Sequence, residues 1–462
     1  MTSNKRRMVS DSMGELEVDA QALYGAQTQR ALNNFPISGS TMPLEFIKAL
    51  LQIKRAAALG NKKLDCLPDE ISSAIDVACV SLLNDPNLIE HFPVDVFQTG
   101  SGTSSNMNVN EVVATLASNA SGLTVNPNDH VNFGQSSNDV IPTAIHVSAV
   151  ITVTRELLPV IDELISVISF KSETLQSVCK TGRTHLMDAM PVRMDQVLNG
   201  WATQAENARA LISSTIAHMH YVAIGGTAVG TGINTHRNFS AAVTQILSKN
   251  VGVHFCPAKE HFSLISSQDS AVALSGQLKT LAVALLKISN DLRWMNSGPL
   301  AGLGEISLEP LQPGSSIMPG KVNPVIPEAV AMVAAQVIGN DSAITVAGQS
   351  GNFELNVMLP LIAYNLLDSV TLLSRSVPLL ANKAIATFEV NKDNLNSTLH
   401  RNPILVTALN PIIGYDNAAE IAKSAYRDNR SIIDVAEEST DLSRKELIAL
   451  LDPEKLTEGG IK

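Results

Sequence analysis

Aromatic residues, charged residues and cysteines are all scarce in this sequence. Phe, Trp and Tyr make up 4% of its 462 residues and the four charged types make up 17%, whereas 45% of the residues are hydrophobic. So low an aromatic content argues against an all-β fold. The four cysteines form no CxxC pair, which is typical of a reducing, cytoplasmic compartment and not of a disulfide framework or a zinc site.

Long apolar runs and excess positive charge are also missing. No segment has 18 or more consecutive apolar residues, so the sequence predicts no membrane span. The basic start, MTSNKRRMVSDSMGE, is followed by no apolar stretch and is not a signal peptide. A net charge of −11 makes nucleic acid and anionic membranes unfavourable partners. Capture of an anionic substrate would then depend on local positive charge and hydrogen-bond donors.

Helical periodicity dominates the middle of the chain. Between 269 and 297 the apolar residues Leu274, Leu278, Leu281, Leu285, Ile288 and Leu292 recur at steps of four and three, which predicts a long helix with an apolar seam. Similar patterns predict helices near 140–176, 194–222, 237–250, 325–346 and 355–386. Strand signals are confined to 15–19 and 253–257. The fold class expected is mainly α, with a central long-helix bundle.

Composition changes suggest three domains. Residues 1–136 are mixed and rich in turns, 137–392 form the long-helix body, and 393–462 carry short, charged helices. No internal repeat is evident.

Four polar stretches interrupt the apolar pattern. They are TGSGTSSNMNVNE (99–111), GQSSNDVIPT (134–143), GGTAVGTGINTH (225–236) and QPGSSIMPGKVNP (312–324). One such stretch alone would be interpreted as a solvated loop. Four together indicate a site for a small, oxygen-rich anion, because small residues let backbone N–H groups approach a ligand and add short, rigid donors. None matches the phosphate-binding GxxxxGK[ST] pattern.

Three ionisable side chains are candidates for the chemistry. Lys321 is the only cation in the loop 312–324, so it could anchor a carboxylate, although a solvated surface lysine is the commoner case. His185 lies in KTGRTHLMDAMP (180–191), where a structural histidine is the alternative, and Glu328 could orient a histidine from another segment. His218 and His220 form an HxH pair that lacks a third ligand, so no metal or other cofactor is expected.

The sequence resembles the class II fumarate hydratases of the fumarase/aspartase superfamily. GSSIMPGKVNP (314–324) matches the signature loop of that superfamily. The other polar stretches, together with GRTHLMDA, GQSGNFELNV and LVTALNPIIGYD (405–416), extend the likeness from about residue 11 to about residue 458. The resemblance implies a three-domain fold and a homotetramer with a shared helical core. It also implies metal-independent, reversible hydration of fumarate to L-malate by anti addition, through an aci-carboxylate intermediate.

The resemblance also implies roles for individual residues. Ser315 would be the base that takes a carbon proton, with backbone N–H groups stabilising its alkoxide. His185 would protonate the leaving hydroxyl with Glu328 as its partner, and Lys321 would act beside them on a substrate carboxylate. The remaining substrate-binding residues implied are Ser101, Thr103, Ser136, Ser137, Asn138, Thr184, Ser316 and Asn323.

A secondary dicarboxylate site of the family corresponds to Asn126, Asn128 and Asp129. Asn126 stands where the family usually has histidine, and the stretch before it is shorter, which puts this site in doubt. VRMDQVLNG (192–200) also departs from the usual family sequence, without a clear effect on the site.

Two alternatives to fumarate hydratase remain at this point. An aspartate ammonia-lyase shares the signature loop, but it usually has glutamine where His185 stands and threonine for the second serine of SSND. A catalytically silent structural protein recruited from the superfamily would have lost the serine, lysine or histidine, whereas Ser315, Lys321 and His185 are all present.

Overall fold

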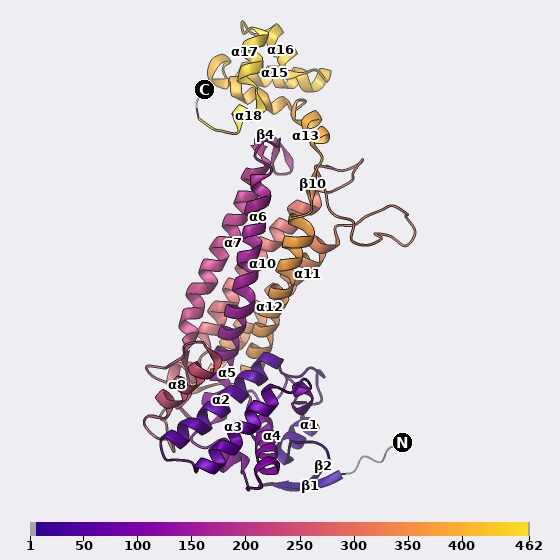
Figure 1. Cartoon of the computed structure of the whole chain (residues 1–462). Coiled ribbons are helices and arrows are strands. Elements are labelled where there is room, and N and C mark those ends of the chain that lie inside the picture. Colours follow the sequence, from indigo (N-terminus) through magenta and orange to yellow (C-terminus); the bar gives the residue numbers. More distant parts are fainter. Residues whose placement is uncertain (1–5, 461–462) are drawn as a thin grey trace. The chain divides into compact units, whose positions relative to one another are not determined.

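The computed structural model describes residues 6–460, and Figure 1 shows that helices make up most of the chain. The five sheets of the described residues have two strands each, so the mainly α fold expected from the sequence is confirmed. The chain divides into two compact units. Unit 1 comprises residues up to Pro159 with Ala208–Ala282 and Ala334–Ser374, and unit 2 comprises Val160–Asn207, Val283–Val333 and Arg375 onward. The division into three domains stays a prediction.

Unit 1 contains the N-terminal elements and three small strand pairs. Its helices are α1 (Ala26–Asn34), α2 (Leu44–Lys63), α3 (Asp69–Leu83), α4 (Thr103–Ser121), α5 (Ser137–Thr152), α8 (Phe239–Val251) and α9 (Phe262–Ser266). Its strands are β1 (Arg6–Asp11), β2 (Gly14–Asp19), β5 (Tyr221–Val222), β6 (Cys256–Pro257), β8 (Gly351–Asn352) and β9 (Leu355–Asn356). β1 and β2 form an antiparallel hairpin, which confirms the strand predicted at 15–19, and β6 is the part of 253–257 that is a strand.

Helix α2 is central to unit 1 and packs against α3, α5 and α8. Its apolar residues Phe46, Leu50 and Ile53 recur at helical spacing and are fully buried. The sequence analysis did not identify α2, α3 or α4 as helices. In α4 the periodicity is hidden because polar residues such as Asn106 and Asn110 are buried on a helix that is covered on several sides.

Unit 2 contains the C-terminal helices and two strand pairs. Its elements are β3 (Cys179–Thr184), β4 (Met187–Arg193), β7 (Ile306–Ser307), β10 (Glu389–Val390), α13 (Lys392–Leu399), α14 (Asn410–Ile413), α15 (Tyr415–Asp428), α16 (Ile432–Ser439), α17 (Arg444–Leu450) and α18 (Pro453–Leu456). The long helices are α6 (Leu158–Glu173), α7 (Met194–Ile216), α10 (Asp269–Met295), α11 (Val325–Gly348) and α12 (Leu359–Leu380), and all five contribute residues to both units.

The helices predicted in the middle of the chain are confirmed. The prediction at 140–176 corresponds to α5 and α6, which a short π turn joins at Val153–Leu157. The six seam residues predicted for 269–297 are at most 1% exposed on α10. The hairpin of β3 and β4 was not predicted, because Gly182 and the polar residues around it give no strand alternation.

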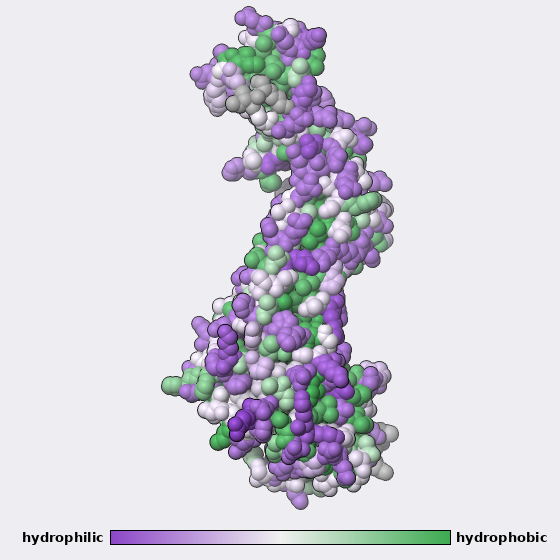
Figure 2. Space-filling view, turned by 60° about the vertical axis from the view of Figure 1, so that its left-hand side comes forward, coloured by the Kyte–Doolittle hydropathy of each residue, from purple (hydrophilic) through white to green (hydrophobic). Residues whose placement is uncertain are grey.

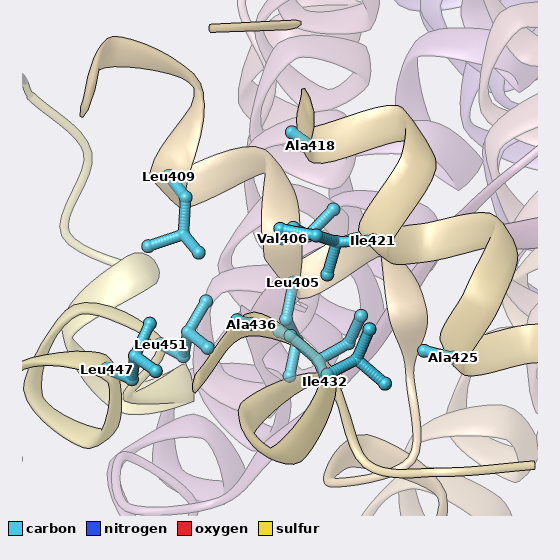
Figure 3. Close-up of a cluster of buried hydrophobic side chains, with 11 residues drawn as sticks. Leu405, Val406, Leu409, Ala418, Ile421, Ala425, Ile432, Ala436, Leu447 and Leu451 are labelled. Atoms are coloured by element: carbon cyan, nitrogen blue, oxygen red, sulfur yellow. The ribbon is translucent and has the colours of Figure 1, made fainter. Parts of the chain in front are cut away.

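A separate apolar core holds the C-terminal helices together. Eleven buried residues form it, among them Leu409, Ile421 and Leu447, and Figure 3 shows their side chains gathered between the short helices. Each of these helices has fewer than 15 residues, so it depends on this shared burial for its stability.

Three stretches of helix are long and apolar enough to cross a membrane by length and composition alone. They are Ser137–Glu173, Asp269–Met295 and Val325–Gly348, and only 33% of the apolar window of the last one is buried. Ser, Thr, Gly and charged residues interrupt their apolar runs, which is why the sequence showed no continuous segment. On the face shown in Figure 2, hydrophobic and hydrophilic residues are interspersed. The expectation that no segment spans a membrane stays a prediction.

Buried His146 makes the stability of unit 1 sensitive to acid. Its Nδ1 donates to the carbonyl of Tyr221 at 2.8 Å, and burial lowers the pKa of His146 to about 4. The unfolded chain therefore takes up this proton at a higher pH than the folded chain, and stability is lost as the pH falls from about 6.5 to about 4. We expect His146→Gln to reduce the loss between pH 7 and pH 5 by about 2 kcal/mol, as measured from urea midpoints. Equal acid sensitivity in both proteins would contradict this.

Candidate active site

The loop before α11 brings Ser315, Lys321 and Asn323 together. The N–H of Gly314 donates to the carbonyl of Lys321 at 2.9 Å, and Asn323 Nδ2 donates to the carbonyl of Gly314 at 2.7 Å. These bonds close the signature loop on itself. A Cβ at position 314 would lie 2.4 Å from the oxygen of Lys321, so only glycine permits this approach.

Ser315 is half-buried in this loop and its oxygen faces backbone donors. Oγ accepts from the N–H of Ile317 at 3.3 Å and from the N–H of Met318 at 3.1 Å. Two N–H groups aimed at one hydroxyl oxygen favour negative charge on that oxygen. The geometry therefore supplies the donors that the sequence analysis expected around Ser315.

A cavity of about 690 Å³, here called the Lys321 pocket, lies at the N-terminal end of α11 in unit 2. Lys321, Asn323 and Glu328 line it together with Arg293 and Trp294. Within residues 6–460, no ion pair is recorded for the exposed Lys321 side chain. Its ammonium group is thus available to an anion, and the positive end of the α11 dipole lies nearby. Ser316 is exposed on the same loop.

His185 lies at the tip of the hairpin of β3 and β4. His185 and Leu186 are the two turn residues, with φ of +55° and +61°. Left-handed conformation at both central positions is the type I′ turn that joins twisted strands, and it normally selects Asn or Gly. Neither His185 nor Leu186 is glycine or asparagine, so the turn holds two side chains in an uncommon conformation. Thr184, at the end of β3, is exposed beside His185.

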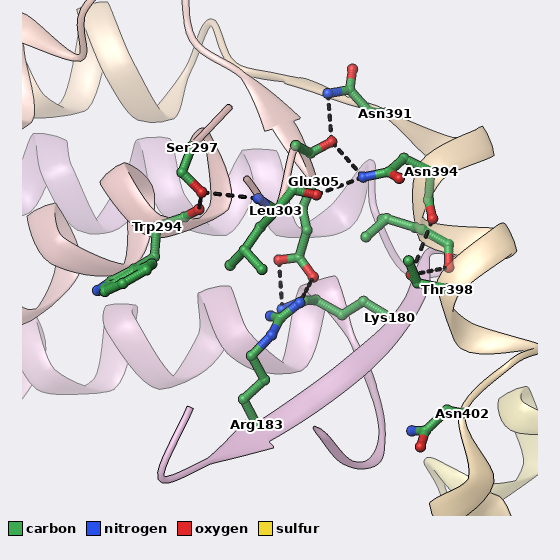
Figure 4. Close-up of polar contacts among 12 residues, drawn as sticks. Lys180, Arg183, Trp294, Ser297, Leu303, Glu305, Asn391, Asn394, Thr398 and Asn402 are labelled. Atoms are coloured by element: carbon green, nitrogen blue, oxygen red, sulfur yellow. Dashed lines mark hydrogen bonds and ion pairs between the residues drawn. The ribbon is translucent and has the colours of Figure 1, made fainter. Parts of the chain in front are cut away.

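A buried ion-pair cluster supports this hairpin. Glu305 is 3% exposed, and its carboxylate contacts Lys180 Nζ at 2.9 Å and Arg183 Nη2 at 2.5 Å (Figure 4). A bulge in β3 between Thr181 and Arg183 explains the arrangement, since residues three apart on a regular strand point to opposite faces. Burial lowers the pKa of Lys180, and the Glu305 carboxylate opposes that shift.

The segment that carries Glu305 is itself held from a second direction. Asn391 Nδ2 donates to the carbonyl of Gly304 at 2.8 Å, and Asn394 Nδ2 donates to the carbonyl of Leu303 at 2.6 Å (Figure 4). The same segment continues into the loop of Ser315. The cluster thus links the His185 hairpin to the segment 303–305, which leads toward the signature loop.

We expect Glu305→Gln to destabilise the protein by about 3 kcal/mol or more, because it leaves two cations near each other without their buried counter-charge. The measurement is the free energy of unfolding from urea titration at pH 7. Glu309→Gln, at an exposed position, is the matched control and should change the midpoint by less than about 0.5 kcal/mol. Similar small effects for both variants would show that the cluster does not hold this region.

A second cavity, here called the α5 pocket, has a volume of about 460 Å³ and lies in unit 1. Thr103, Ser136, Ser137 and Asn138 line it. Ser136 caps α5 in a capping box with Asp139, so the serines are held at a helix N-terminus, where anions are favoured. Ser101 is buried and its Oγ lies 2.8 Å from Thr103 Oγ1.

Two of the polar stretches predicted from the sequence meet at this pocket. Asn138 Nδ2 donates to the carbonyl of Ala228 at 2.7 Å. Asp139 Oδ2 accepts from the N–H groups of Gly225 and Thr227, both at 2.9 Å. Burial raises the pKa of Asp139 to about 6, although these donors oppose that shift. The stretch 134–143 is therefore fastened to the stretch 225–236.

The residues of the expected secondary site form a capped turn. Asn126 Oδ1 accepts from the N–H groups of Asn128 and Asp129 at 2.8 and 2.9 Å and so caps the turn that follows. The side-chain oxygen of Asn126 already accepts these two hydrogen bonds. The exposed carboxylate of Asp129 disfavours binding of an anion beside it. The secondary dicarboxylate site stays a prediction.

The structure brings the signature-loop residues together in unit 2 and the α5-pocket residues together in unit 1, whereas Thr184 and His185 line neither pocket. No hydrogen bond between His185 and Glu328 is recorded in the part of the chain that the structure describes, so their pairing stays a prediction. Among the same residues, no group of three or more His, Cys, Asp or Glu side chains is placed to hold a metal ion.

Sequence reasoning missed several buried charged residues near these groups, among them Lys54, Asp139 and Glu305. For Lys54 a signal existed, because it continues the helical spacing of Phe46 and Leu50 and so falls on the buried face of α2.

Comparison with known proteins agrees with this geometry. Residues 14–339 match the lyase family, and residues 405–458 match the C-terminal domain of fumarase C. The first match covers more than half of the chain, so the chain is a lyase. A fumarate hydratase class II 2 of Pseudomonas aeruginosa is 64% identical, with 98% of this chain and 99% of that protein aligned. A fumarate hydratase class II of Xylella fastidiosa is 57% identical over 99% and 97% of the two chains.

Solved structures show the same likeness. A class II fumarase from Schistosoma mansoni has a TM-score of 0.96 and 37% identity, covering 98% of this chain and 99% of that one. A fumarate lyase:delta crystallin from Brucella melitensis, bound to cobalt, has a TM-score of 0.92 and 39% identity over 98% and 100%. The chain belongs to the class II fumarate hydratase family.

Proposed function

We propose that this protein catalyses the reversible hydration of fumarate to L-malate, by anti addition and without a metal ion. The observation that carries the proposal is the loop in which Ser315 Oγ faces two backbone N–H groups beside Lys321 and Asn323. Relatives bearing the name fumarate hydratase class II align over nearly the whole chain, which supports the same reaction.

In the dehydration direction, Ser315 is the base that removes the proton from the carbon beside a carboxylate. A serine hydroxyl is a weak base, and the N–H groups of Ile317 and Met318 stabilise its alkoxide. The loop holds these donors in place before substrate arrives, so little reorganisation is needed during the reaction.

The intermediate is an aci-carboxylate with two negative charges on one group. Two unit charges about 4 Å apart already repel by about 4 kcal/mol at an effective dielectric near 20, and charges within one group lie closer than that. Lys321 and Asn323 offset this cost by binding the carboxylate, with Ser316 and Thr184 completing this part of the binding shell. Ser101, Thr103, Ser136, Ser137 and Asn138 supply the other hydroxyl and amide donors.

His185 is the acid that protonates the leaving hydroxyl, and Glu328 is its partner in the assembled protein. We propose a homotetramer in which each active site draws residues from three subunits. Exposed apolar side chains on the long helices support such an assembly, notably Val283 at 52%, Met332 at 69% and Val346 at 55% exposed. The net charge disfavours nucleic acid and anionic membranes as partners, and the free cysteines suit the reducing cytoplasm.

The proposal is tested by following the ultraviolet absorbance of the fumarate double bond with purified protein and a chelator. L-Malate and L-aspartate are supplied separately. The absorbance should rise with L-malate alone. A rise with L-aspartate alone would make the protein an ammonia-lyase, and a rise with L-malate that the chelator abolishes would contradict metal independence.

A further inference from the structure

A buried lysine lies behind the α5 pocket, whose lining residues are all neutral. Lys54, on α2, is 0% exposed, and its Nζ donates to Asn132 Oδ1 and to Gln135 Oε1, both at 2.9 Å. Asn132 and Gln135 line the pocket. A single residue, Asn132 or Gln135, therefore separates the Lys54 ammonium group from the pocket. The proposed function places a substrate carboxylate in that pocket.

Lys54 decides which way its two amide partners point. An ammonium group donates hydrogen bonds and accepts none, so both amides must present oxygen to it. Their NH₂ groups turn to backbone carbonyls instead. Asn132 Nδ2 donates to the carbonyl of Gln135 at 3.2 Å, and Gln135 Nε2 donates to the carbonyl of Val131 at 3.0 Å. The orientation of each side-chain amide is therefore determined twice, by the ammonium group that its oxygen accepts from and by the carbonyl that its NH₂ group donates to.

The donor-to-acceptor direction of these hydrogen bonds is passed on from Asn132 through Asn106 to Ser137. Asn106 Nδ2 donates to Asn132 Oδ1 at 3.2 Å and to Ser137 Oγ at 3.1 Å. A flipped Asn106 would place its oxygen against the oxygen of Asn132. Because the Ser137 oxygen accepts from Asn106, its hydroxyl proton is left to point elsewhere. No other partner of this hydroxyl is recorded among residues 6–460, and Ser137 lines the α5 pocket.

We propose that Lys54 is a positioning residue that sets the direction of this hydrogen-bond chain, so that the Ser137 hydroxyl donates its proton to the substrate carboxylate. The inference rests on the proposed function, because it takes Ser137 as a carboxylate-binding residue. Lys54 also places an ammonium group behind the neutral pocket lining, which favours binding of an anion.

The cost of burying Lys54 favours a functional reason for keeping it. Desolvation lowers the pKa of Lys54 to about 7, and Asp139 on α5 and Cys79 on α3 only partly oppose that shift. A lysine retained solely for packing would be replaced by an apolar residue without this penalty.

A double-mutant cycle tests the inference. Lys54→Met, Ser137→Ala and the double variant are compared with wild type for kcat and KM of L-malate, using the full-length protein. Each single substitution should raise KM about 10-fold, as expected for the loss of one directed hydrogen bond to a charged group, with kcat within about 3-fold of wild type. The double variant should match Ser137→Ala, because Lys54 acts through Ser137.

Two further variants complete the design. Lys48→Met, on the same helix with a half-buried ion pair to Glu45, should keep the wild-type KM. Asn132→Ala interrupts the hydrogen-bond chain without changing the lysine and should also raise KM. If Lys54→Met does not fold, this variant tests whether the hydrogen-bond chain matters for binding.

Separate results overturn the inference and the proposed function. A wild-type KM in Lys54→Met or in Asn132→Ala, or KM effects that multiply in the double variant, would overturn the role of Lys54. A wild-type protein without activity toward L-malate would instead overturn the proposed function.

Discussion

Replacing Ser315 by alanine should lower kcat for L-malate dehydration by about 10³-fold or more, because the variant loses the group that takes the carbon proton. Removal of one hydroxyl from a half-buried loop position should leave the fold unchanged, since the bonds between Gly314, Lys321 and Asn323 that close the loop do not involve this side chain. The KM should change much less than kcat. The measurement is the initial rate of fumarate formation.

The matched control for this variant is Ser73→Ala. Ser73 is exposed on α3, and its Oγ donates to the backbone carbonyl of Asp69. It should keep wild-type kcat and KM. Substantial activity in Ser315→Ala, within about 10-fold of wild type, would show that another group is the base.

Lys321→Met should reduce kcat/KM by about 10³-fold, which corresponds to about 4 kcal/mol. The loss should appear in both constants, because the ammonium group binds the substrate carboxylate and binds the doubly charged aci-carboxylate more strongly. Lys321→Arg keeps the charge but presents a planar fork in place of a point charge, so we expect it to recover only part of the loss. Steady-state rates over a range of L-malate concentrations give both constants.

Lys445→Met is the charge-matched control, at an exposed position on α17. Both lysine variants change the net charge equally, so a general electrostatic effect on a dianionic substrate would appear in both. If Lys445→Met lost as much activity as Lys321→Met, the local role of Lys321 would be refuted.

Periodicity predicted the long helices well because each carries a continuous apolar stripe. On α10 the seam from Leu274 to Leu292 is buried as its spacing required. Helix α4 was missed for the opposite reason, since Asn106, Asn110 and Glu111 are buried through hydrogen bonds that connect distant segments. Such burial leaves no apolar pattern in the sequence.

The candidate site was predicted mainly from loop composition and from the family resemblance. The signature loop indicated Ser315 and Lys321, and the structure adds the two N–H groups that face the serine oxygen. The supporting residues could not be predicted this way. Glu305 and Lys180 are 125 residues apart, taking 305 minus 180, and only a bulge in β3 places Lys180 and Arg183 on the same carboxylate.

The most direct test of the central claim is hydration of fumarate in D₂O, followed by proton NMR of the malate formed. Anti addition by the proposed residues places the deuterium and the hydroxyl on opposite faces of the former double bond, so a single diastereomer of L-malate with one deuterium at C3 is expected. A mixture of diastereomers, the syn product, or no malate at all would contradict the account.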